Sequence, residues 1–174
     1  SDDATGGKAP VTRFNGRLSP HRVIEAIPFA MDDVRKIRHA FEGVTVNDVF
    51  LAASAGAVRR YLDSKGELPD AALRALVPMT TRGSVKDPEA GNQIGMAEMT
   101  LFTQVADDAE RLQMIHRGSA KGKRAAETFG RDLQGRLFQI LPTAVAKYAQ
   151  QQFVLPRINL TVSNVRGPDV PLYM

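Results

Sequence analysis

One stretch of twenty residues, GVTVNDVFLAASAGAVRRYL from Gly43 to Leu62, constrains the fold more than any other part of the 174-residue chain. Its apolar content predicts one helix from about Val46 to Ser64, stopped by Gly66 and Pro69. The run of small residues Ala52–Ala57 would let another backbone approach closely, although its mid-helix glycine costs about 1 kcal/mol relative to alanine. We therefore expect a central helix packed tightly against a sheet, with its N-terminus facing a cleft.

The start of this helix combines a cap with a polar residue that the cap does not explain. Thr45 is suited to be the N-cap, and Asp48 three residues on can close a capping box, so Asp48 has a structural explanation. Asn47 shares a helix face with Leu51 and Ala55, and that face is otherwise nearly apolar. A buried amide without partners costs about 1–3 kcal/mol, so we expect Asn47 to meet a neighbouring backbone or a bound ligand.

Hydrophobic periodicity predicts further helices and strands on both sides of this helix. Strands are expected at 21–30 (ending at Pro28), 72–82, 92–103 and 157–165, the third of them apolar on both faces and therefore buried. Helices are expected at 31–41, from Asp107 onward, at 133–141 and at 143–153. The order β-α-α-β-β-α-α-α-β predicts an α/β layered sandwich with a mixed β-sheet.

Composition narrows the chemistry open to the chain. There is no cysteine, which excludes disulfides, a thiolate nucleophile and thiolate metal ligands, and which suits a cytosolic protein. No apolar run approaches the roughly 20 residues that span a bilayer, and residues 1–12 are typical of a flexible linker rather than a signal peptide. The chain lacks an initiator methionine and ends on VPLYM, so we expect a piece of a longer protein in which residues 13–174 form the folded unit.

Positive charge is concentrated between Arg117 and Arg136, where six bases face two acids, a balance of +4 that equals the net charge of the whole chain. The bases are Arg117, Lys121, Lys123, Arg124, Arg131 and Arg136. Such a patch favours a phosphate-bearing ligand, an anionic membrane surface or nucleic acid. A solvated helix face explains the same charges equally well.

Recognisable catalytic motifs are scarce. The histidines His21, His39 and His116 lack metal-ligand spacing, and we predict that they are surface or capping residues. A G-x-S-x-G elbow is absent, so a hydrolase triad is not supported. Polar groups do stand at the ends of predicted elements, where they could line a shared cleft: Asn47 and Asp48, Thr80–Arg82, Asn92 and Gln93, and Ser163 and Asn164.

Four segments, taken together and in order, resemble one family. They are FNGRLSPHR, GVTVNDVFLAASAGAVRRYL, LVPMTTR followed by GNQIG, and NLTVSNVRGPDVPLY. This ordered set resembles the C-terminal region of bacterial wax ester synthase/diacylglycerol acyltransferases, over nearly the whole chain from Arg13 onward. The short TVNDV motif also occurs in related condensation domains. The ordered set of four segments is therefore more specific than any single segment.

The resemblance implies a chloramphenicol-acetyltransferase-like half of an enzyme made of two similar α/β halves with a channel between them. The implied reaction transfers a fatty acyl group from coenzyme A to a long-chain alcohol or diacylglycerol. Acyl-CoA would be a co-substrate, and no permanently bound cofactor is expected. The family's general base is a histidine in an H-H-x-x-x-D-G motif in the N-terminal half. That motif is absent here, so the segment alone is expected to be inactive without its N-terminal partner.

The resemblance also suggests roles for particular residues. Asn47 and Asp48 match an Asn-Asp pair regarded as important for activity, and we expect supporting roles for both. Candidate substrate contacts are Arg82, Asn92, Ser163 and Asn164. Candidate phosphate or membrane contacts are Lys121, Lys123, Arg124, Arg131 and Arg136. The expected location is cytoplasmic, with peripheral contact to the inner membrane face or to lipid inclusions.

Two other functions compete with this interpretation. The first is a non-catalytic domain of the same fold that binds a lipid surface or a protein partner. The second, a nucleic-acid module, is not favoured, because the charge is modest, aromatic residues are few and no recognition motif is present.

Overall fold

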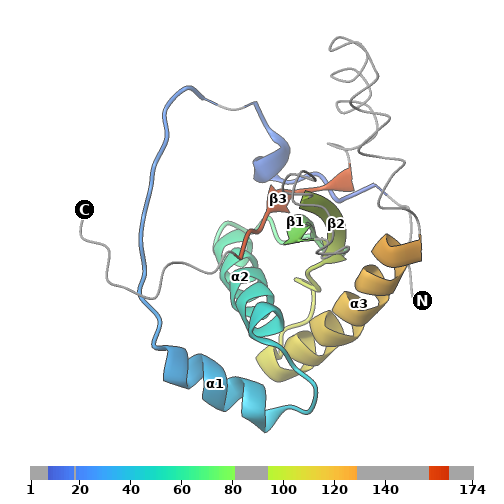
Figure 1. The fold of residues 1–174 in the computed structure, drawn as a ribbon. Coiled ribbons are helices and arrows are strands. Elements are labelled where there is room, and N and C mark those ends of the chain that lie inside the picture. The colour runs from blue at the N-terminus through green and yellow to red at the C-terminus, as the bar shows by residue number, and fades with distance from the viewer. Residues whose placement is uncertain (1–7, 18, 81–93, 129–156, 165–174) are drawn as a thin grey trace.

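The computed structural model describes residues 8–17, 19–80, 94–128 and 157–164. Within these ranges the chain forms a short 3-10 turn, three α-helices and three strands (Figure 1). They are η1 (Arg13–Asn15), α1 (Met31–Ala40), α2 (Val46–Asp63), β1 (Arg74–Thr80), β2 (Ile94–Thr100), α3 (Asp108–Thr128) and β3 (Leu160–Thr161). The predicted helices at 133–141 and 143–153 lie outside the described residues.

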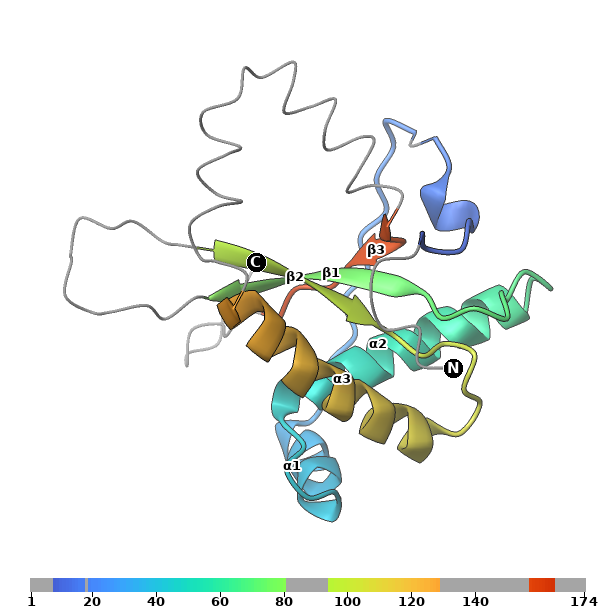
Figure 2. The same ribbon diagram turned by 90° about the vertical axis from the view of Figure 1, so that its right-hand side faces the viewer.

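The sheet is mixed, as the sequence predicted. Its strand order is β2-β1-β3, with β1 antiparallel to β2 and parallel to β3. Helices α2 and α3 lie side by side on one face of this sheet, and α1 lies beyond them (Figure 2). The α/β layered architecture is therefore confirmed, and α2 packs on the sheet through side chains of a shared apolar cluster.

The core lies between the sheet and the two helices. Alternate residues of β1 point toward the helices, and Ala75 and Val77 are buried there. They join one apolar cluster with Leu51 and Ala55 of α2 and Ile115 of α3. A second, smaller cluster consists of Val44, Val49 and Leu112, with Phe41 packed against it. This second cluster fixes the beginning of α2 against α3.

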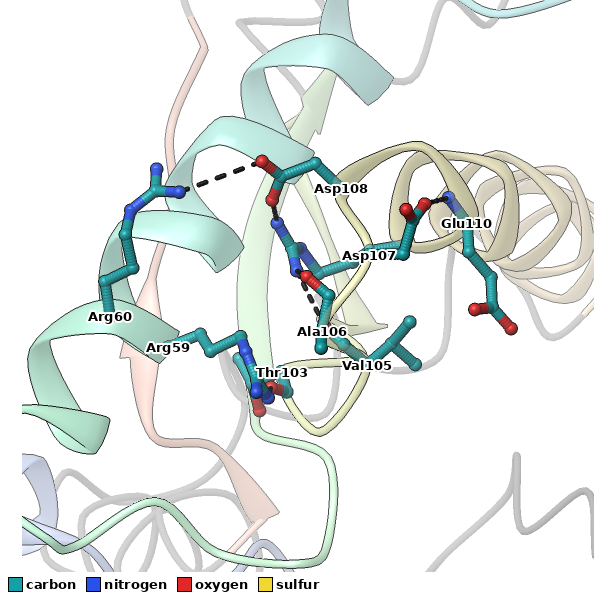
Figure 3. A network of polar contacts seen from close by, with 9 residues as sticks. Arg59, Arg60, Thr103, Val105, Ala106, Asp107, Asp108 and Glu110 are labelled. Carbon is teal, nitrogen blue, oxygen red and sulfur yellow. Dashed lines mark hydrogen bonds and ion pairs between the residues drawn. The ribbon is translucent and has the colours of Figure 1, made fainter.

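At Gly56, the small residue in the middle of α2 makes room for a side chain. A Cβ added at Gly56 would lie 2.8 Å from a guanidinium nitrogen of Arg111, which is only 2% exposed. Arg111 donates to the Val105 carbonyl at 2.7 Å and pairs with Asp108. The Asp108 carboxylate also lies 3.8 Å from Arg60 of α2 (Figure 3). The glycine thus permits the buried arginine side chain to pack against α2, while the Arg60–Asp108 pair joins α2 to α3.

The predicted strand at 21–30 is wrong. These residues have no regular secondary structure, every one of them is exposed, and the segment forms a long arc between η1 and α1 (Figure 1). Val23 is 93% exposed and Ile24 is 92% exposed. A strand needs a neighbour to take up its backbone hydrogen bonds, and no described strand pairs with this segment.

The prediction that β2 is buried on both faces is also wrong. The described helices cover only one face of the sheet, so Ala97 and Met99 are buried against them while Met96 and Glu98, on the other face, are exposed. Strand β3 is shorter than predicted. Near it, Asn159 is buried and accepts a hydrogen bond from the backbone of Arg74 at 2.9 Å.

The segment before η1 reaches β3. Ala9 is buried, and the Pro10 carbonyl accepts a 2.7 Å hydrogen bond from Asn159. The last residues of the expected linker, 1–12, therefore contact the sheet, whereas residues 1–7 lie outside the described ranges. In the part of the chain that is described, no helix is both long and apolar enough to cross a bilayer.

Candidate functional site

The first turn of α2 is closed by a reciprocal cap, as the sequence predicted. Thr45 Oγ1 accepts a 3.2 Å hydrogen bond from the Asp48 amide. Asp48 Oδ2 accepts hydrogen bonds from the Thr45 amide at 3.0 Å and from the Thr45 hydroxyl at 2.9 Å. Asp48 is only 1% exposed, so this capping box places a carboxylate inside the protein.

His116 of α3 completes the surroundings of that carboxylate. Its Nδ1 lies 3.0 Å from Asp48 Oδ2, and its side chain is 31% exposed. An ionised carboxylate can only accept, so Nδ1 carries the proton that it donates. The expectation that His116 is a surface or capping residue is therefore wrong. No local pattern marks a partner 68 positions away in the chain.

These donors decide the charge of Asp48. Burial raises the pKa of Asp48, but the hydrogen bonds from His116 and Thr45 outweigh it, so the pKa falls below the ordinary value of 3.8. Ser119 lowers the pKa further, although neither its Oγ nor Asp48 Oδ1 has a hydrogen-bond partner among the described residues. Asp48 is therefore an ionised, buried carboxylate at neutral pH.

Asn47 lies next to this carboxylate and remains partly exposed. Its Oδ1 accepts a long hydrogen bond of 3.5 Å from Asn164 Nδ2, which arrives from the segment after β3. The structure thus brings together two of the candidate site residues, 117 positions apart in the chain. Neighbouring Ser163 is exposed.

The remaining candidates cannot be placed at this site. Arg82, Asn92, Arg131 and Arg136 lie outside the described residues. Lys121, Lys123 and Arg124 belong to the later part of α3, where the structure describes the backbone only. Their expected contacts with substrate, phosphate or membrane therefore stay predictions. Among the residues described, no group of three or more His, Asp or Glu side chains could hold a metal ion.

Two adjoining open pockets form a groove at the start of α2. One pocket, of about 480 Å³, is lined by residues between 38 and 46. The other, of about 250 Å³, includes His116 and Arg117 in its wall. Phe41, Glu42 and Val44 line both. The loop before α2 can follow the His116 ring closely because Gly43 has φ +75°, and a Cβ there would lie 3.1 Å from His116 Nε2. The sequence predicted that the start of this helix faces a cleft, but it did not identify the wall residues from α3, such as His116 and Arg117.

Family models match most of the chain. The model for the WS/DGAT C-terminal domain matches residues 90–174, and the model for the wax ester synthase/diacylglycerol acyltransferase catalytic domain matches residues 3–50. The second match includes Asn47 and Asp48.

Individual proteins agree with these matches. A Mycobacterium tuberculosis protein named as a diacylglycerol O-acyltransferase is 34% identical over 95% of this chain and 34% of its own length. The O-acyltransferase WSD of Acinetobacter baylyi is 33% identical over 99% of this chain and 37% of its own length. The structure of a wax ester synthase/diacylglycerol acyltransferase from Marinobacter aquaeolei matches with a TM-score of 0.59 and 30% identity, over 83% of this chain and 31% of that one. The chain thus spans about a third of the length of these relatives.

Proposed function

Because the chain belongs to the wax ester synthase/diacylglycerol acyltransferase family, we propose that it is the C-terminal part of an acyl-CoA-dependent O-acyltransferase. The proposed substrates are a fatty acyl-CoA and a long-chain alcohol or diacylglycerol, and the products are wax esters or triacylglycerol. The proposed partner is the N-terminal half of the same enzyme. These assignments rest on the names of relatives about three times as long as this chain.

The observation that carries the proposal is the position of Asn47. Its amide is partly exposed on the first turn of α2, and the neighbouring capping box and His116 hold that turn in place. An amide held in this way can donate to an oxyanion or orient a reacting group. Asp48 cannot donate while it is ionised, so its proposed role is to hold the turn.

The proposed chemistry is acyl transfer assisted by a general base. A histidine base takes the proton of the acceptor hydroxyl, whose oxygen attacks the thioester carbonyl. The tetrahedral intermediate then collapses, the carbon–sulfur bond breaks, and the coenzyme A thiolate leaves and takes up a proton. The H-H-x-x-x-D-G motif that supplies the general base in this family is absent from the sequence, and Nε2 of His116 faces Gly43 of the neighbouring loop. We therefore place the base in the N-terminal half.

A non-catalytic lipid-surface domain is the second candidate. Exposed apolar side chains between Val23 and Phe29 favour it, because such a segment can contact lipid as well as protein. In either case the proposed location is cytoplasmic, in peripheral contact with the inner membrane face or with lipid inclusions.

Acyl transfer by the full-length protein is the test. Purified full-length protein is incubated with palmitoyl-CoA and either hexadecanol or a diacylglycerol, and the lipid products and free coenzyme A are quantified. The proposal predicts equal amounts of ester and free coenzyme A from the full-length protein, and no ester from residues 1–174 alone. Liposome binding by the full-length protein without ester formation would reject it in favour of the lipid-surface domain.

A further inference from the structure

We propose that His116 is a positioning residue for acyl transfer, holding Asn47 in place through Asp48. The inference rests on the proposed function, because it assigns a role within the same site. His116 lies on α3, and its ring reaches the first turn of α2 across the groove beside Phe41 and Val44.

The ring contacts two sides of the turn that carries Asn47. Nδ1 donates to Asp48 Oδ2 within that turn. Nε2 faces the preceding loop, where Gly43 leaves room for it. A planar ring wedged between the loop and the turn fixes the angle at which the chain enters α2.

The carboxylate depends on this ring because it is poorly supplied with other donors. Asp48 Oδ1 is buried without a hydrogen-bond partner among the described residues, so the interactions of the carboxylate gather on Oδ2. Removing the His116 donor leaves Thr45 and, with a smaller effect, Ser119 to stabilise a buried negative charge. Such a group must recruit water or move, because an unpaired buried charge is costly. Movement of Asp48 shifts the residue next to it, Asn47, and a water in place of the ring leaves the turn without the side chain that packs against it.

A histidine that donates from Nδ1 to a carboxylate can act as a base only through Nε2. Here Nε2 faces Gly43 of the preceding loop, and the proposed positioning role needs only a donor at the place of Nδ1. An asparagine side chain can put an amide N–H close to the position of Nδ1, but it has no group that matches Nε2. Asparagine at position 116 should therefore preserve a positioning role but abolish acid–base catalysis by the ring.

The test compares four versions of the full-length protein: wild type, His116→Ala, His116→Asn and Ile115→Val. Ile115 is the buried neighbour on α3, and its substitution removes one methyl group from the core without touching Asp48. For each version we would measure kcat and KM for acyl-CoA, the thermal midpoint, and hydrogen exchange at the amides of residues 45–49.

The proposal predicts that His116→Ala lowers kcat by about tenfold to 100-fold, as small misplacements of reacting groups do, with a much smaller change in KM. His116→Asn should recover most of the rate. Amides in the first turn of α2 should exchange faster in His116→Ala but not in Ile115→Val. Two results would overturn the proposal. One is that Ile115→Val lowers kcat as much as His116→Ala does. The other is that His116→Asn is as slow as His116→Ala.

The two proposals fail in different ways. Absence of ester formation by the wild type removes the proposed function and, with it, the catalytic part of the role of His116. The exchange measurement does not depend on turnover. If residues 45–49 exchange equally in wild type and His116→Ala, the ring does not hold the turn and the inference is wrong even in an active enzyme.

Discussion

Asp48 shows how one side chain can be both a cap and a buried charge. A single oxygen, Oδ2, takes hydrogen bonds from Thr45 and His116, so the carboxylate stays ionised despite its burial. The part of this site that involves neighbours in sequence was predictable, because Thr45 and Asp48 have the spacing of a capping box. The contacts with His116 and Asn164 were not, because they join positions 68 and 117 residues apart.

The lowered pKa of Asp48 predicts a particular dependence of stability on pH. Because the folded pKa lies below the unfolded value of about 3.9, the unfolded state binds more protons between the two values. The contribution of Asp48 is therefore fully present above the unfolded pKa and is lost as the pH falls through the folded one.

Denaturation of the full-length protein and its Asp48→Asn variant, measured between pH 7 and pH 2, checks this prediction. The stability advantage of the wild type should stay level above about pH 5 and shrink below about pH 4. An advantage that grows on acidification would contradict a carboxylate that is stabilised in its charged form.

At the scale of elements, glycines in the helices serve different purposes. Gly56 of α2 lies under the guanidinium group of Arg111, whereas Gly118 of α3 has only an ordinary 3.6 Å contact with Phe102 for an added Cβ. Sequence alone assigns both the same helix penalty, since Arg111 lies 55 positions from Gly56 and its approach depends on how α2 and α3 pack.

Alanine substitutions at these two glycines should therefore have opposite effects. Gly118→Ala should raise the free energy of unfolding by about 0.5–1 kcal/mol, because it removes the backbone entropy of glycine. Gly56→Ala gains the same entropy but displaces the buried guanidinium group of Arg111, and overpacking of about 1–3 kcal/mol should leave the variant net destabilised. Thermal unfolding of both full-length variants measures this. A higher midpoint for Gly56→Ala would show that Arg111 moves aside at little cost.

At the scale of the whole molecule, residues 19–30 stand apart from the described core. The apolar residues at 21–30 predicted a strand, but such a pattern gives no information about where the partner strand lies. Ile27 and Phe29 are exposed along with Val23 and Ile24. The catalytic-domain model matches residues 3–50 and thus includes this segment, and the relatives are about three times longer than the chain. The exposed apolar side chains and the greater length of the relatives both favour a contact between residues 21–30 and the N-terminal half.

Protection of this segment in the full-length protein is the corresponding prediction. Hydrogen exchange at residues 21–30 should be slow in the full-length protein and fast in the 1–174 fragment. Residues 112–119 of α3, which are packed in both, are the internal reference. Equally fast exchange at 21–30 in both proteins would mean that the N-terminal half does not cover the segment.

The most direct test of the account is the effect of Asn47→Ala on acyl transfer by the full-length protein. Ser64→Ala is the matched control, because it changes a polar residue that caps the opposite end of α2, about 26 Å from Asn47 along the helix axis. Asn47→Ala should lower kcat by about 100-fold, as loss of an oxyanion donor does, with a thermal midpoint close to that of the control. An Asn47→Ala enzyme that turns over as fast as Ser64→Ala would contradict a role for the first turn of α2 in the reaction.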